Sequence, residues 1–122
     1  MSGIPVAEDV LDAAIAVLPL PEVATVLGTS TNKVRQLLRD GQLIGLKRGG
    51  ELCVPSDFFV EDGVVKGLTG TITVLADSGF SRTEMLRWLF TEDDSLPGST
   101  PINALRANRG TEVKRRAQAM AF

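Results

Sequence analysis

Histidine and tyrosine are absent from this 122-residue sequence, and cysteine occurs once, at Cys53. Without histidine there is no Ser–His or Cys–His pair and no imidazole base, and a single cysteine excludes an intramolecular disulfide and the common zinc clusters. No apolar run approaches the roughly 18 residues of a membrane span. The start, MSGIPVAEDV, lacks the basic and apolar regions of a signal peptide. We therefore expect a cytoplasmic, non-membrane protein without a catalytic centre, metal or cofactor.

The charge is unevenly distributed, although the whole chain carries only −2. Residues 30–48 contain five basic side chains and one acid, Asp40, whereas residues 1–18 contain three acids and no base. A second basic stretch, residues 106–116, has five basic side chains against Glu112. Local patches of this kind, rather than the total charge, mark surfaces that bind nucleic acid.

Turn and capping signals divide the chain into three parts. We expect a tail or short helix over residues 1–18, a middle unit over 19–62 and a helical region over 63–122 packed on it. In the last part, Ser81 and Glu84 fit a capping box that opens a helix.

The middle unit has the order helix, turn, helix and hairpin. The expected elements are helices over 21–28 and 30–40 and strands over 43–48 and 51–55. Gly28 is a natural helix stop, Ser30 is a good N-cap, and Gly49-Gly50 is a hairpin signal. This is the order of a winged helix-turn-helix. We therefore predict a mainly α protein with a small β-hairpin, in which a winged helix-turn-helix precedes a helical C-terminal region.

The helix over 30–40 separates its apolar and polar residues sharply. At about 100° per residue, its apolar face consists of Val34, Leu37 and Leu38. The opposite face consists of Asn32, Arg35, Gln36 and Arg39. Arginine suits guanine edges and phosphate, and asparagine and glutamine suit adenine, so the pattern favours a helix that enters the major groove of DNA.

Other candidate contacts surround this helix. The full set on the helix and hairpin is Ser30, Thr31, Asn32, Lys33, Arg35, Gln36, Arg39, Lys47 and Arg48. Free N–H groups at the helix start, beside Ser30 and Thr31, suit a phosphate, and the hairpin tip would place Lys47 and Arg48 on the DNA backbone. Further phosphate contacts are expected from Lys114, Arg115 and Arg116.

Several stretches resemble known proteins. Residues 18–55, LPLPEVATVLGTSTNKVRQLLRDGQLIGLKRGGELCVP, resemble excisionase-like and MerR-like winged helix-turn-helix domains. The phrases IPVAEDVLD, VVKGLTGTITVLADSGF, EMLRWLF and EVKRRAQAMAF resemble a small actinobacterial family of DNA-binding proteins, whose known mycobacterial member is a substrate of a membrane Ser/Thr protein kinase.

The family resemblance implies duplex DNA as the partner and no known catalysis. From this resemblance and the α-helical pattern of residues 30–40, we interpret the chain as a sequence-reading or general duplex DNA-binding protein that acts in transcription regulation. It also implies a Ser/Thr protein kinase as a second partner, acting on a threonine in the N-terminal tail. The first 24 residues of this chain contain no threonine, however, and Ser2 is their only hydroxyl. Phosphorylation of this tail is therefore not expected here.

A second interpretation concerns the C-terminal half. RWLF, an acidic-polar loop and TPINALRANRGTEV resemble the toxin-binding region of Xre-type antitoxins. The alternative function is thus an antitoxin-like or adaptor protein whose C-terminal helices bind a protein partner. A homodimer is usual for helix-turn-helix proteins, but the sequence shows no clear heptad for one.

Overall fold

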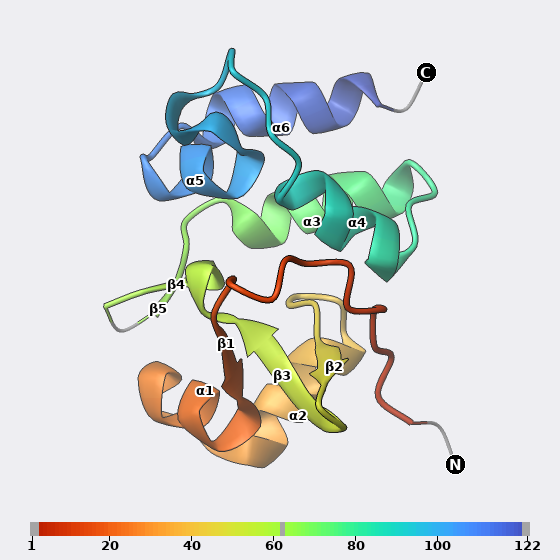
Figure 1. Cartoon of the computed structure of the whole chain (residues 1–122), viewed down its shortest axis with the longest axis vertical. Coiled ribbons are helices and arrows are strands. Elements are labelled where there is room, and N and C mark those ends of the chain that lie inside the picture. The colour runs from red at the N-terminus through yellow and green to blue at the C-terminus, as the bar shows by residue number, and fades with distance from the viewer. Residues whose placement is uncertain (1–2, 62, 121–122) are drawn as a thin grey trace.

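The computed structural model describes residues 3–61 and 63–120 (Figure 1). The elements of its first half are β1 (Val17–Pro19), α1 (Leu20–Leu27), α2 (Thr31–Arg39), β2 (Leu46–Arg48) and β3 (Glu51–Pro55). The second half comprises a short 3-10 turn (Ser56–Phe58), β4 (Phe59–Val60), β5 (Gly63–Val64), α3 (Leu68–Asp77), α4 (Arg82–Leu89), a second 3-10 turn (Pro97–Ser99), α5 (Pro101–Arg106) and α6 (Gly110–Ala119). This is a winged helix-turn-helix followed by a helical region, as predicted.

The turn between α1 and α2 is built from local signals. Gly28 ends α1 with φ +65°, a left-handed conformation that glycine adopts without steric cost. The Ser30 hydroxyl then accepts a hydrogen bond from the Lys33 amide at 3.1 Å and caps α2. Pro21 is the second residue of α1 rather than the first, because the helix begins at Leu20.

The wing is the β2–β3 hairpin. Its register pairs Arg48 with Glu51 across Gly49 and Gly50, whose φ values of +61° and +80° fit a type I′ turn. Strand β2 is shorter than the predicted 43–48, since it is paired with β3 only from Leu46 onward. Residues 43–45 instead form a buried connection from α2.

The N-terminal segment, residues 3–19, packs as part of the winged unit, which comprises α1, α2 and the β2–β3 wing. Strand β1 pairs antiparallel with β3, so the sheet order is β1-β3-β2. Before it, the chain runs between the sheet and α4 (Figure 1): the Ala7 amide donates to the Gly45 carbonyl at 2.7 Å, and the Glu8 amide donates to Thr83 Oγ1 at 2.9 Å. Residues 3–16 form no helix, and they connect the two halves of the molecule.

The C-terminal helices share a hydrophobic core with the winged unit. Phe58 lies against Phe90 with ring centroids 6.0 Å apart. Arg106 of α5 donates to the carbonyl oxygens of Asp57 and Phe59 at 3.0 and 2.6 Å.

Among the described residues, no helix has both the length and the apolar character to cross a membrane.

Candidate nucleic-acid interface

Helix α2 presents the polar face that its sequence predicts. Val34 and Leu38 are fully buried, whereas Asn32, Gln36 and Arg39 are exposed. Lys33 is also exposed, and Arg35 and Thr31 are half-buried. In Figure 1, α2 lies with α1 at the end of the long axis opposite α6, so the C-terminal helices α5 and α6 do not cover it. We call the face formed by Asn32, Arg35, Gln36 and Arg39 the α2 ridge.

Side chains of the ridge are oriented by hydrogen bonds along the helix. Asn32 Oδ1 accepts from Arg35 Nη1 at 3.3 Å, and Gln36 Nε2 donates to Asp40 Oδ1 at 2.8 Å. Both contacts join residues three or four positions apart, which are neighbours on a helix surface. The Arg35 guanidinium has further N–H groups, and the Gln36 carbonyl oxygen is not used in its contact, so each keeps capacity for another partner.

Lys47 and Arg48 at the wing have different surroundings. Lys47 is exposed, as expected for a residue beside the hairpin tip. Arg48 instead points back to the N-terminal segment: its Nε and Nη2 donate to the Asp9 carboxylate at 2.9 and 3.1 Å, and its Nη1 donates to the Ile15 carbonyl at 2.6 Å. The hydrogen bond from Arg48 lowers the pKa of Asp9 below its ordinary value. This geometry gives Arg48 a structural role, and it disfavours the predicted phosphate contact.

The predicted C-terminal contacts are separated from the ridge. Lys114 is exposed, but Arg115 Nη1 donates to Glu112 at 3.2 Å. Arg116 donates to Glu112, Asp93 and Ser95 at 3.0, 2.7 and 2.8 Å, and so fastens α6 to the loop before α5. Because α6 and α2 lie at opposite ends of the long axis in Figure 1, these residues do not extend the α2 surface.

The basic side chains of α2 are not engaged in ion pairs with the residues that the structure describes. Among residues 3–61 and 63–120, the ion pairs join Arg48 to Asp9, Arg115 to Glu112, and Arg116 to Asp93 and Glu112. The basic residues of α2 and the wing tip without such a pair are Lys33, Arg35, Arg39 and Lys47. They form a group of cationic side chains that no carboxylate of the described chain neutralises through a direct contact.

Sequence reasoning missed the partner of Arg48. Asp9 lies 39 residues away in the chain, and its segment is brought beside the wing by the pairing of β1 with β3 and by the Ala7–Gly45 hydrogen bond. The sequence offered one indication of this ion pair: residues 1–18 are acidic, whereas the stretch 30–48 is basic. Cys53 is 2% exposed, and burial raises the pKa of its thiol, so it packs in the core as a small hydrophobic residue.

A turn-linked helix pair with an exposed cationic second helix, followed by a small wing, defines the winged helix-turn-helix class. Comparison with known families agrees: the family described as "DNA-binding protein Rv2175c, wHTH domain" matches residues 3–59, and "Rv2175c C-terminal domain of unknown function" matches residues 65–121. The chain belongs to the Rv2175c family.

A relative and a solved structure extend this match over the whole chain. The relative is "DNA-binding protein Rv2175c" of Mycobacterium tuberculosis (strain ATCC 25618 / H37Rv), 42% identical over 134 residues that cover 100% of this chain and 92% of the relative. The NMR structure of Rv2175c superposes with a TM-score of 0.87 at 42% identity, covering 99% of this chain and 91% of that one. The likeness therefore includes both the winged unit and the helical region.

Proposed function

We propose that this protein binds duplex DNA and regulates transcription, with α2 in the major groove and the wing tip on the neighbouring backbone. The observation that carries the proposal is the α2 ridge, in which Asn32, Gln36 and Arg39 are exposed and Arg35 is half-buried. The cationic side chains of α2, and Lys47 of the wing, form no ion pair with any carboxylate in the described part of the chain. The name of the mycobacterial relative, a DNA-binding protein, supports it.

The base contacts are assigned to the ridge. Arg35 and Arg39 carry the planar donors that match the O6 and N7 acceptors of guanine, and Asn32 and Gln36 carry the amides that match adenine. Their hydrogen bonds along α2 restrict the orientation of Asn32, Arg35 and Gln36 before DNA arrives, which lowers the entropy lost on binding.

Phosphate contacts are assigned to the ends of this surface. Ser30, Thr31 and Lys33 lie at the N-terminus of α2, where backbone N–H groups and the helix dipole favour an anion. Lys47 and the exposed Gly49-Gly50 tip form the wing contact. Arg48 is left out because Asp9 already binds it.

The charge near α2 favours the approach of DNA to this side. Residues 30–48 carry a net +4, whereas the whole chain carries −2, which leaves −6 on the remaining residues. Residues 106–116 also carry a net +4, but Arg115 and Arg116 of that stretch are held in ion pairs. A polyanion is attracted to the α2 side, and such a field steers association.

The test is DNA binding by a double variant, Arg35→Ala with Arg39→Ala. We expect it to bind a selected duplex at least tenfold more weakly, since a lost bidentate base contact costs roughly 1–3 kcal/mol. Fluorescence anisotropy with a labelled duplex, selected beforehand from a random-sequence pool, measures the affinity. The matched control is Arg87→Ala, which removes an exposed arginine from α4. Equal binding by the double variant and the wild-type protein would exclude α2 as the reading helix.

A further inference from the structure

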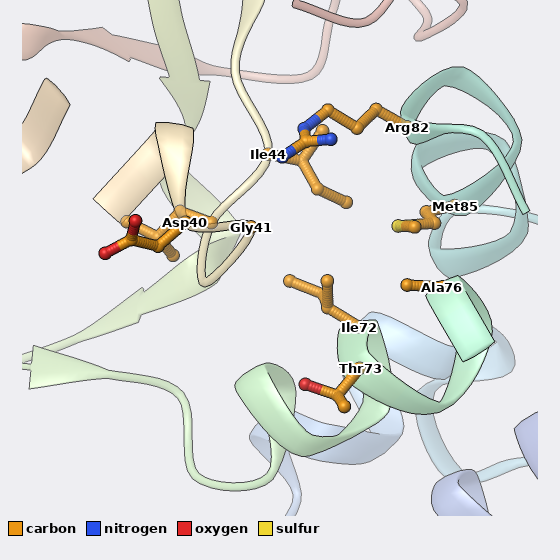
Figure 2. A pocket seen from close by; sticks show the side chains of 9 residues that line it. Asp40, Gly41, Ile44, Ile72, Thr73, Ala76, Arg82 and Met85 are labelled. Atoms are coloured by element: carbon orange, nitrogen blue, oxygen red, sulfur yellow. The ribbon is translucent and has the colours of Figure 1, made fainter. Parts of the chain in front are cut away.

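A cavity of about 250 Å³ lies where the winged unit meets the C-terminal helices. It is bounded by the end of α2, the connection that follows it, α3 and α4 (Figure 2). Its apolar lining comes from both halves of the chain: Leu43, Ile44, Ile72, Ala76 and Met85. This cavity is separate from the α2 ridge and takes no part in the proposed DNA contacts.

Arg82 is the cationic residue of the cavity. Its side chain reaches from the start of α4 toward the loop that carries Gly41 and Ile44 (Figure 2), and its Nη2 donates to the Leu38 carbonyl at 3.3 Å. Its Nε is buried and has no hydrogen-bond partner among the described residues. A buried N–H without an acceptor is costly, and such exceptions in a folded protein call for an explanation.

We propose that this cavity binds a small organic carboxylate with an aliphatic body. The apolar walls suit the hydrocarbon part, and the Arg82 guanidinium suits a carboxylate, which can accept from two of its N–H groups at once. The volume corresponds to roughly eight water molecules and therefore to a ligand of about that many heavy atoms. An inorganic anion would satisfy Arg82 but would leave the apolar walls without contacts.

The position of the cavity gives the ligand a regulatory consequence, and this step rests on the proposed DNA binding. Asp40 and Gly41, which directly follow α2, belong to the lining. Arg82 also contacts the last turn of α2 through the Leu38 carbonyl. A carboxylate bound to Arg82 thus acts on the end of the proposed reading helix. If the carboxylate changes the affinity of the protein for DNA by some factor, DNA changes the affinity for the carboxylate by the same factor.

Isocaproate, with eight heavy atoms, is the probe, and its neutral amide isocaproamide is the matched comparison. A ligand of this size is expected to bind with a Kd of roughly 1 mM or less. Methyl NMR spectra of the full chain report the site directly. We expect isocaproate to shift the methyl signals of Ile44, Ile72 and Met85, whereas Ile102, buried elsewhere, stays unchanged. No shift up to about 20 mM would mean that the cavity holds water only, and would overturn the proposal.

Two variants distinguish the contribution of the Arg82 charge to ligand binding from that of the cavity space. Arg82→Gln should weaken isocaproate binding at least about tenfold and leave isocaproamide unaffected, and Arg87→Gln on the same helix should change neither. Ala76→Leu fills the cavity from an exposed position of α3 and should abolish binding of both compounds, which keeps the test valid if Arg82→Gln does not fold. Equal affinity for the acid and the amide would overturn the carboxylate assignment.

The regulatory step has its own readout. The DNA affinity of the full chain, measured with and without saturating isocaproate, should differ by threefold or more, a coupling at the low end of the usual range. Identical DNA affinities alongside the expected methyl shifts would contradict the coupling and leave the carboxylate site in place. Loss of DNA binding altogether would contradict the proposed function, again without affecting the methyl result.

Discussion

At the scale of single residues, the two neighbours Lys47 and Arg48 show how local geometry decides between binding and structure. Successive side chains of a strand point to opposite faces. Lys47 is consequently exposed, whereas Arg48 faces the N-terminal segment, with 24% of its side chain accessible, and pairs with Asp9. Of two adjacent basic residues, Lys47 is therefore available to DNA, whereas Arg48 stabilises the fold.

Replacing Lys47 by alanine should change DNA binding, whereas replacing Arg48 by alanine should change the stability of the fold. Lys47→Ala removes one phosphate contact, so it should weaken binding to all sequences alike and reduce the salt slope of log K by about one. Arg48→Ala removes an anchor of the N-terminal segment, so it should lower the free energy of unfolding and leave the salt slope unchanged. Anisotropy at two salt concentrations and urea unfolding measure the two effects. An unchanged slope in Lys47→Ala would remove the wing tip from the interface.

At the scale of elements, the sequence predicted those features that depend on a few neighbouring residues. The Gly28 stop, the Ser30 cap and the Gly49-Gly50 turn each act within one turn of chain, and all three are confirmed. The capping box of α4 is confirmed as well: Ser81 Oγ accepts from the Glu84 amide at 3.1 Å, and Glu84 Oε1 accepts from the Ser81 amide at 2.8 Å.

Features that depend on distant pairing were not predicted. Strand β1 exists because Leu18 pairs with Val54, and residues 17–19 carry no local pattern that specifies this partner. The cavity beside Arg82 and the link from Arg116 to Asp93 likewise need the packing of separate helices. For the candidate site, helical periodicity predicted the α2 ridge, whereas the ion pairs that occupy Arg48 and Arg116 became visible only in three dimensions.

The capping box gives a prediction for α4. Ser81→Ala removes the acceptor for the Glu84 amide and should lower the free energy of unfolding by about 1 kcal/mol. The expected DNA affinity of the folded protein is unchanged, because α4 is not part of the proposed interface. Urea unfolding measures the first effect, with Thr111→Ala, an exposed hydroxyl in the first turn of α6, as the control. A loss no greater than that of the control would show that the cap is dispensable.

At the scale of the whole molecule, the N-terminal segment holds the winged unit and the helical region together. It bonds to the connection before the wing through the Ala7 amide, to the wing through Asp9, and to α4 through the Thr83 hydroxyl. The segment therefore positions the wing relative to the C-terminal helices, although its sequence has no strong secondary-structure pattern.

This arrangement predicts a pH dependence. The Asp9 pKa is lower in the folded chain than its ordinary value of 3.8, so folding favours the ionised carboxylate. The stabilisation by Asp9 is then complete above that ordinary value and is lost as the pH falls through the lowered pKa. The free energy of unfolding of Asp9→Asn should accordingly fall below that of the wild-type protein at about pH 7, and the difference should shrink below about pH 4. A difference that stays constant or grows on acidification would contradict the role of this ion pair.

DNA should contact the α2 side of the molecule and not the opposite, α6 end. Backbone amide NMR spectra of the full chain, recorded during titration with duplex DNA, test it directly. We expect the largest shifts on residues 30–39 and on the wing tip at 47–50, with little change at 114–116. Shifts that centre on 114–116 while α2 stays unperturbed would contradict it.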